Sequence, residues 1–233
     1  MCGKFRCLKP WGASRDLAEA IGAASGEDGG AGEEETQTPG RWASVVHLAA
    51  DGSRVVTPML WGWPKFLGAE RSKGMHIHAR AEEIDMRPTW AEAFRLRRGM
   101  ILATSFNEAD ELPGGKTRQW VCAPADGAGL RIGVIYQDSA TSDGEVLTCF
   151  VMVTTAPCDA LAAKNITRMP AVIAGADVPV WLGETGASPA AAKAVLRPYP
   201  GALIVEEETR VYPHTAPVQR RRKPGDDAQP GLF

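Results

Sequence analysis

Two runs of β-branched and aromatic residues constrain the fold more than any other feature of this chain. They are "LRIGVIYQD" at residues 130–138 and "EVLTCFVMVTTAP" at residues 145–157. Such runs favour strands, and their near-continuous apolar character predicts strands that are buried in a core. The chain must therefore be built around a β-sheet.

Other segments predict more strands and a few short helices. Residues 42–63 alternate apolar and polar side chains around the turn signal "DGS", which predicts a β-hairpin. Residues 75–84 should be a strand passing into a helix, residues 98–109 one strand with a polar end, and residues 202–208 a last strand. Helical spacing is found at residues 14–21, 88–97, 158–166 and 188–196, the last with Ser188 as its N-cap. The prediction is a single α+β domain with a mainly antiparallel, barrel-like β core and flanking short helices.

Composition divides the chain into a domain and a tail. Residues 1–218 form the predicted domain, and the Gly-rich acidic stretch at residues 22–38 is expected to be a flexible loop. Residues 219–233, "QRRRKPGDDAQPGLF", are charged and contain Pro and Gly, so we expect a disordered C-terminal tail.

Charge and cysteine content limit the environment. The net charge is −2, which argues against a protein that binds nucleic acid through a generally basic surface, although the 26 Lys and Arg residues can still form a local basic groove. No apolar run is long enough to span a bilayer, and no signal peptide is recognisable. The five cysteines are scattered without a CxxC pair. These features predict a cytoplasmic protein without membrane contact, and we expect a monomer.

The start of the chain, "MCGKF", places a cysteine directly after the initiator methionine. Removal of Met1 would leave Cys2 with an α-amine and a thiol on adjacent carbons. Such groups titrate at about 8 and about 8.5, so both are partly available as nucleophiles at neutral pH. A 1,2-aminothiol reacts characteristically with an aldehyde, first forming an imine that the thiol closes into a thiazolidine ring. Most second-position cysteines have no such role, so other motifs of the chain must indicate whether Cys2 reacts in this way.

Two motifs suggest contacts with an anionic or stacked ligand. "WGWPKF" at residues 61–66 is either a hydrophobic turn or an aromatic wedge for bases. "HIHAR" would place His76, His78 and Arg80 on one strand face. Two histidines at this spacing can bind zinc, but no second pair matches, so a polar strip facing an anionic substrate is favoured and no metal is expected.

Two further positions are candidates for proton transfer or turns. Glu108 in "TSFNEAD" stands where a predicted strand ends, a common place for a catalytic group, although a lone glutamate there is usually solvated. "NITRMP" at residues 165–170 is either a simple turn or a polar loop that presents Arg168.

Taken together, these motifs resemble the SRAP family (SOS-response-associated peptidase), the abasic-site processing proteins. The family begins Met-Cys-Gly-Arg-Phe, where this chain has "MCGKF". Its Ala-Pro-Gly turn corresponds to "TPG" at residues 38–40, and its Trp-Gly motif to "WGW" at residues 61–63.

The second half of the resemblance follows in the same order. The family's Asn-Ala-Arg-x-Glu corresponds to "HARAE" at residues 78–82, and its Phe-x-Glu to "FNE" at residues 106–108. Its Thr-containing strand, helix and Arg-Met-Pro turn correspond to "VMVTTAPCDALAAKNITRMP" at residues 151–170. The resemblance extends over about residues 1–218.

The resemblance implies covalent capture of abasic sites in single-stranded DNA, without metal or organic cofactor. Cys2 would react with the sugar aldehyde, and Glu108 would act as general acid and base. Arg80, Lys4 and Arg168 would hold phosphates, and Trp61 and Trp63 would separate or stack bases. The whole expected DNA-binding set is Lys4, Pro39, Gly40, Trp61, Trp63, Arg80, Thr154 and Arg168.

Three positions depart from the family pattern. Lys4 replaces an arginine and loses its bidentate fork, and His78 replaces an asparagine that helps fix the sugar. The family's histidine in His-Asp-Arg-Met-Pro falls on Ile166, which cannot transfer a proton. Either Asn165 or His78 substitutes for it as a catalytic group, or the step that this histidine serves is weakened.

The last five residues, "QPGLF", resemble the Gln-x-x-Leu-Phe peptides that bind the bacterial sliding clamp. Gln229, Leu232 and Phe233 would be the anchors of this clamp-binding peptide.

Two other functions remain open from the sequence. One is a non-catalytic, clamp-associated module that binds single-stranded DNA, because the family histidine is missing. The other is an N-terminal-cysteine glutamine amidotransferase, which also begins Met-Cys-Gly, although the Asn-Gly pair of those enzymes occurs nowhere in this chain.

Overall fold

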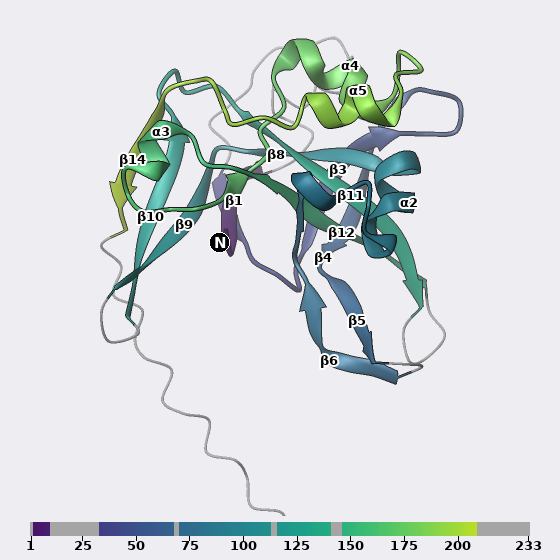
Figure 1. Cartoon of the computed structure of the whole chain (residues 1–233), viewed down its shortest axis with the longest axis horizontal. Coiled ribbons are helices and arrows are strands. Elements are labelled where there is room, and N and C mark those ends of the chain that lie inside the picture. The colour runs from purple at the N-terminus through teal and green to yellow at the C-terminus, as the bar shows by residue number, and fades with distance from the viewer. Residues whose placement is uncertain (1, 10–32, 68–69, 113–115, 141–145, 209–233) are drawn as a thin grey trace, which may run out of the picture.

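The fold was analysed in a computed structural model that describes residues 2–9, 33–67, 70–112, 116–140 and 146–208 (Figure 1). Strands dominate these residues, and the helices are short. The strands are β1 (Lys4–Lys9), β2 (Glu33–Gln37), β3 (Trp42–Leu48), β4 (Arg54–Trp61), β5 (Trp63–Leu67), β6 (Glu70–His76), β7 (His78–Arg80), β8 (Arg98–Ala103), β9 (Ser105–Leu112), β10 (Lys116–Pro124), β11 (Leu130–Ala140), β12 (Val146–Thr155), β13 (Met169–Pro170) and β14 (Leu203–Glu207). The helices are η1 (Ala81–Glu83), α2 (Pro88–Leu96), α3 (Asp159–Ala162), η2 (Gly175–Asp177), α4 (Val178–Leu182) and α5 (Pro189–Ala194).

Five strands close into a barrel in the order β11-β8-β3-β4-β12, because β12 also pairs with β11. All of these pairings are antiparallel except that between β12 and β4. The two β-branched runs of the sequence form β11 and β12, whose pairing closes the barrel. This arrangement confirms the predicted α+β fold with a barrel-like, mainly antiparallel core.

A second, fully antiparallel sheet has the order β14-β10-β9-β1-β2 and lies beside the barrel (Figure 1). Its strand β1 is held between β9 and β2, so the beginning of the chain enters the interior of a sheet instead of an edge. Cys2, two residues before β1, is consequently buried.

Two hydrophobic clusters hold these layers together. One joins the barrel to the second sheet and includes Cys2, Phe5, Trp61, Phe106 and Phe150. The other packs the opposite faces of the barrel strands against α2, α4 and α5. The site around Cys2 is therefore part of the core between the two β layers.

Several local predictions are confirmed. The hairpin is formed by β3 and β4, with Val46 opposite Val56, and its turn contains Gly52 at a φ of 85°. Helix α2 lies in the predicted segment, and Ser188 caps α5 by accepting a hydrogen bond of 3.2 Å from the backbone N–H of Ala191.

Other local predictions are wrong. Residues 33–37 are not a loop, because they pair as strand β2 along the free edge of β1. Their polar side chains fit an edge strand, which has solvent beside it. Residues 98–109 are not one strand but two, β8 in the barrel and β9 in the second sheet, so this segment connects the two layers.

The expectation that His76, His78 and Arg80 of "HIHAR" share one face of a single strand is also wrong. The strand ends at His76 and a new one begins at His78, in a different sheet. His76 packs edge-on against Trp90 with ring centroids 5.1 Å apart, while His78 and Arg80 lie along β12. His76 therefore does not share a face with His78.

The predicted helix at residues 14–21, the remainder of the acidic loop at residues 22–32 and the tail at residues 219–233 lie outside the described residues. Among the helices that the structure describes, none has the length and apolar character needed to cross a membrane.

Candidate active site around Cys2

Cys2 lies at the boundary between the barrel and the second sheet with no exposed surface. Its Sγ donates a hydrogen bond of 3.4 Å to the Lys4 carbonyl. Burial raises the pKa of the Cys2 thiol well above its usual range, the charge of Glu108 raises it further, and backbone hydrogen bonds with Lys4 and Asn107 oppose the rise. The thiol is therefore protonated at neutral pH until a base removes the proton.

Glu108 is the acidic partner of this cysteine. It lies on β9, opposite Trp120 of β10, with 1% of its surface exposed. Burial raises the pKa of Glu108 to about 7, although backbone hydrogen bonds from Cys2 and Ala109 lower it. A carboxyl group with this pKa is present in both protonation states at neutral pH, which suits a general acid and base.

His78 is the third titratable group of the site. It lies on β7 beside Met152 of β12. Burial lowers the pKa of His78 to about 4; a backbone hydrogen bond with Cys2 raises it, and the charge of Arg168 lowers it. The ring is thus neutral at pH 7, and its buried Nε2 has no hydrogen-bond partner among the described residues.

Arg168 and Thr154 lie next to His78. Both terminal guanidinium nitrogens of Arg168 donate to the Glu82 carboxylate, at 2.7 and 3.0 Å, and Nη2 also donates to Thr154 Oγ1 at 3.1 Å. Arg80 lies opposite Thr154 in the pairing of β7 with β12 and is exposed. The structure thus brings together Arg80, Thr154 and Arg168, three of the residues expected to bind DNA.

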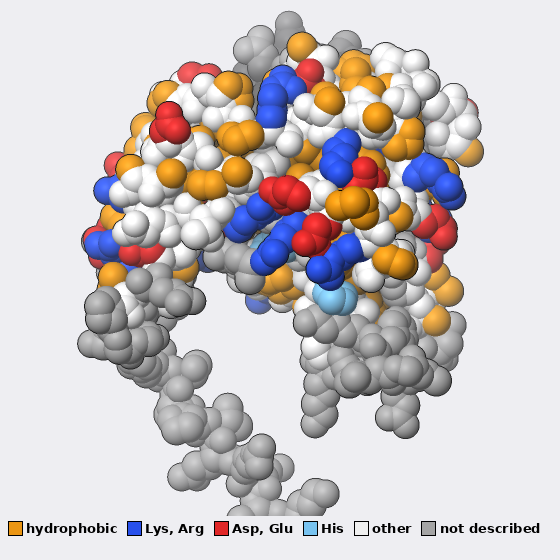
Figure 2. Space-filling view, viewed as in Figure 1, with side chains coloured by type: hydrophobic (Ala, Val, Ile, Leu, Met, Phe, Trp, Pro, Cys, Tyr) orange, Lys and Arg blue, Asp and Glu red, His pale blue; other side chains and the backbone are white. Residues whose placement is uncertain are grey.

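Acidic side chains are mixed with the basic ones on this face. Figure 2 shows Lys and Arg side chains alternating with Asp and Glu at its centre instead of forming a uniformly basic surface. Near the site, the ion pairs Lys193–Asp85 and Arg168–Glu82 likewise combine basic and acidic side chains. A DNA phosphate would have to compete with these carboxylates.

Lys4 is engaged in a similar way. Its Nζ pairs with Glu208, which also accepts hydrogen bonds from Arg6 at 3.5 Å and from Asn107 Nδ2 at 3.3 Å. Glu208 is largely buried. The sequence did not identify Asn107, Arg6 or Glu208 as site residues. The position of Asn107 next to Glu108 could have indicated its place in the site, whereas Glu208 in the run "EEE" is typical of a solvated residue.

Pro39 and Gly40 form a tight turn between β2 and β3. The N–H of Arg41 donates to the Thr38 carbonyl at 3.1 Å, and Gly40 has a φ of 84°, where a side chain would be strained. The N–H of Gly40 also donates to the Trp61 carbonyl at 2.8 Å, which fixes the turn to the end of β4.

Trp61 and Trp63 are not available to stack on bases, which corrects that expectation. Trp61 packs between Phe5 and Phe150, and its Nε1 donates to the Ile77 carbonyl at 3.2 Å. Trp63 packs on Trp90, and its Nε1 donates to the Cys149 carbonyl at 2.9 Å. Both indoles are fully buried core residues with satisfied N–H groups.

Asn165 is not placed to replace the missing histidine either. It is exposed at the end of α3 with a φ of 58°, and its backbone N–H donates to the Ala162 carbonyl. No described contact joins it to Cys2 or Glu108. Ile166, by contrast, is buried in the same cluster as Cys2, so an apolar side chain occupies the position where the resemblance places a histidine.

Two tryptophans that the sequence did not single out lie in contrasting surroundings, Trp42 exposed and Trp120 buried. Trp42 has 50% of its surface exposed, the largest exposed aromatic group among the described residues. Trp120 lies opposite Glu108, and its ring carries Lys164 Nζ at 4.5 Å and the Arg118 guanidinium at 4.7 Å from its centroid. Neither has a sequence signal, because their exposure and neighbours depend on the fold.

A comparison with family models matches residues 1–220 to the model described as SRAP, SOS response associated peptidase. The chain belongs to the SRAP family. The family description associates an SRAP protein with the SOS response to DNA damage and includes a peptidase-like activity in its name. Cys2, Glu108 and the Arg168 turn of this SRAP chain lie within the matched region.

Solved structures with the same fold come from two bacteria. A protein from Bordetella bronchiseptica shares 20% sequence identity, with a TM-score of 0.70 over 90% of this chain and 100% of its own. A phage-related protein from the same organism gives a TM-score of 0.64 at 18% identity over 90% and 95% of the two chains. A Bacteroides thetaiotaomicron protein gives 0.57 at 20% identity over 70% and 72%. A comparison with curated protein sequences found no match.

Within the residues that the structure describes, no three His, Cys, Asp or Glu side chains are grouped as a metal site. The predicted clamp-binding residues Gln229, Leu232 and Phe233 lie outside those residues.

Proposed function

We propose that this SRAP protein captures abasic sites in single-stranded DNA as a covalent crosslink through Cys2, after Met1 is removed, and thereby shields the lesion. The observation that carries the proposal is the contact of Cys2 with Glu108, whose pKa of about 7 suits proton transfer at neutral pH. Membership of a family associated with the SOS response supports DNA as the substrate.

The proposed reaction needs only an aldehyde and the two groups of Cys2. The freed α-amine adds to the aldehyde of the ring-opened abasic deoxyribose, and loss of water from the adduct gives an imine. The thiol sulfur then bonds to the imine carbon while its proton passes to the nitrogen. The net products are a thiazolidine and one water molecule, and no cofactor takes part.

Glu108 supplies the proton transfers in this scheme. As an acid it protonates the sugar ring oxygen during opening and the hydroxyl group that leaves as water. As a base it accepts the thiol proton, which the raised pKa of Cys2 otherwise keeps on sulfur. Both roles require a pKa near neutrality, which is the value that burial produces at Glu108.

His78 has a binding role in the proposal. Because its pKa is about 4, it acts as a neutral ring that can hydrogen-bond to the opened sugar. Its buried, unpartnered Nε2 supports this role, since an unsatisfied polar atom in a core is costly unless a ligand completes it.

Phosphate binding would use Arg80 first, because it is exposed beside Thr154. Arg168 and Lys4 are paired with Glu82 and Glu208, so a phosphate would exchange with these carboxylates. The affinity for DNA should therefore fall steeply with salt, as for any contact dominated by phosphates.

A gel assay tests the proposal. A single-stranded oligonucleotide with one abasic site should give a denaturation-resistant protein band with the wild type. Cys2→Ala should remove the band, and Cys122→Ala, another buried cysteine of the same cluster, should retain it. Absence of the band with the wild type contradicts covalent capture.

A second function is favoured by one observation. Ile166 occupies the position of the family histidine and is buried in the same hydrophobic cluster as Cys2, so the covalent step could be lost while DNA binding remains. A protein that binds abasic and intact single strands equally, without a crosslink, would be such a non-catalytic module.

A clamp interaction is proposed for the tail. The Gln229, Leu232 and Phe233 pattern of "QPGLF" predicts that deletion of residues 229–233 abolishes binding to a bacterial sliding clamp while crosslinking is unchanged. A tail peptide without measurable clamp affinity contradicts this part.

A further inference from the structure

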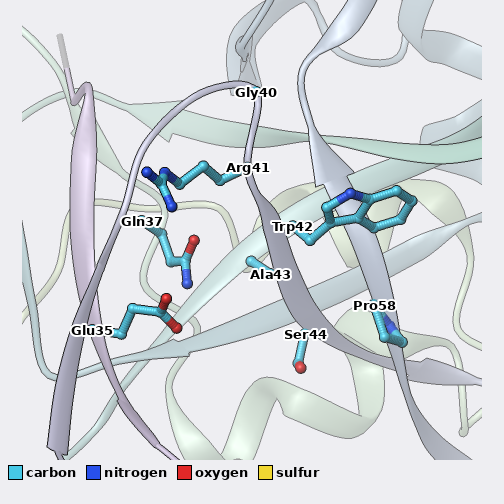
Figure 3. A pocket seen from close by; sticks show the side chains of 8 residues that line it. All are labelled: Glu35, Gln37, Gly40, Arg41, Trp42, Ala43, Ser44 and Pro58. Carbon is cyan, nitrogen blue, oxygen red and sulfur yellow. The ribbon is translucent and has the colours of Figure 1, made fainter.

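A pocket of about 450 Å³ opens where strand β2 turns into strand β3, apart from the Cys2 site (Figure 3). Glu35 and Gln37 of β2 and Arg41 of the turn line the pocket on one side of β3, and Trp42 of β3 and Pro58 of β4 lie on the other side (Figure 3). The proposed reaction uses none of these residues.

Gln37 is the observation that points to a ligand. Its side chain is 3% exposed, and its Oε1 has no hydrogen-bond partner among the described residues. Figure 3 shows the amide directed into the space beside Arg41 and Glu35. A buried carbonyl oxygen without a hydrogen-bond donor is destabilising, so the Gln37 oxygen calls for a donor beyond those that the described residues supply.

The charges of the pocket narrow the class of ligand. One guanidinium and one carboxylate face the same space, so their charges balance and a phosphate is not the favoured occupant. The pocket instead offers acceptors on Glu35 and Gln37 and donors on Arg41. A neutral, planar group with donors on one edge and acceptors on another would satisfy both sides.

Among nucleobases, guanine has this pattern. Its O6 and N7 are acceptors that pair with arginine, the commonest specific base contact of proteins. Its N1–H and N2–H₂ are adjacent donors that suit the Gln37 oxygen and the Glu35 carboxylate. Thymine has one N–H on its pairing edge, between two carbonyl oxygens, so it supplies one donor where guanine supplies adjacent donors.

The pocket is close enough to Cys2 for one DNA strand to reach both sites. Gln37 pairs with Phe5 across β1 and β2, and Phe5 is three residues from Cys2. Three extended residues span about 10 Å. We propose that this pocket binds the guanine base of a nucleotide flanking the lesion. This inference rests on the proposed function only in that the protein must bind single-stranded DNA.

Binding of intact oligonucleotides tests the pocket without any covalent step. Fluorescence anisotropy would compare oligo(dT) strands that carry one central G, A or C. The strand with G should bind about 5- to 100-fold more tightly than oligo(dT), the range of one well-formed base contact. Equal affinities, or a preference for A or C, would overturn the assignment.

Two variants test whether a preference for G depends on this pocket. Gln37→Met replaces the buried amide with an apolar chain of similar length and should abolish the preference for G while oligo(dT) still binds. Gln137→Met, on strand β11, is the matched control and should leave the preference unchanged. If both Gln37→Met and Arg41→Ala still prefer the strand with G, guanine is recognised elsewhere and the assignment to this pocket is wrong.

The outcomes also separate this inference from the proposed function. Crosslinking of abasic DNA without a base preference refutes the guanine pocket alone. A preference for G on intact strands without any crosslink refutes covalent capture alone.

Discussion

Replacing Glu108 by glutamine should stabilise the protein at high pH. The pKa of Glu108 is about 7 in the fold against 4.5 for an ordinary glutamate, so the folded state holds the proton more tightly than the unfolded chain. Stability from this group is fully present below pH 4.5 and is lost as the pH rises through 7. Because the pKa differs between about 7 and 4.5, the free energy of unfolding is lower by about 3 kcal/mol at pH 8 than it would be with a protonated Glu108. Glu108→Gln has no proton to lose and avoids this decrease.

Urea unfolding of both proteins at pH 5 and pH 8 measures this difference. The variant should exceed the wild type by about 3 kcal/mol at pH 8 and by about 1 kcal/mol or less at pH 5. The corresponding rise in Tm at pH 8 is about 6–12 °C for a chain of this size. Equal stabilities at pH 8, or a difference that does not change with pH, would refute the raised pKa and with it the catalytic assignment of Glu108.

Three further outcomes follow from the site. NMR titration of His78 should find a neutral ring down to about pH 5, with the midpoint at about 4; a midpoint above 6 contradicts its burial. Trp61→Ala should lower the free energy of unfolding by about 3–5 kcal/mol, because its indole lies in the core. Trp42→Ala should change the free energy of unfolding by less than about 1 kcal/mol and weaken single-stranded DNA binding about 5- to 100-fold, because its indole is exposed. The reverse result refutes both placements. Ile166→His should accelerate crosslinking by at least about tenfold if a missing proton donor limits the rate, and a folded variant without acceleration dismisses that explanation.

The barrel was predictable because its strands carry their own signals. The β-branched runs of β11 and β12 favour strands wherever they are placed, and the "DGS" turn fixes the β3–β4 hairpin locally. The Ser188 cap likewise depends on residues three positions apart. Such features need no knowledge of the tertiary structure.

The second sheet was harder to predict because its strands depend on their neighbours. Strand β2 is acidic and forms by pairing along β1, and the "RQWVC" part of β10 gains its environment from β9. No local property marks the break at Thr104 that sends β9 into a different layer from β8.

Within the site, chemistry could be predicted but exposure could not. Cys2 and Glu108 were identified from residue type and resemblance, and the fold brings them together. The tryptophans of "WGW" were expected at a DNA surface, but Trp61 and Trp63 fill the core and Trp42 is exposed instead. Which aromatic residue faces solvent is decided by packing between layers, which the sequence does not specify.

The central claim is that the amine and the thiol of Cys2 both bond to the abasic sugar. Intact mass and peptide mapping of the purified protein after reaction with an abasic single strand, without any reducing agent, test it directly. We expect a chain that lacks Met1 and a DNA adduct, formed with loss of one water, on the peptide that begins with Cys2. A chain that retains Met1 and forms no adduct, or an adduct that is trapped only by borohydride on a lysine, would contradict it.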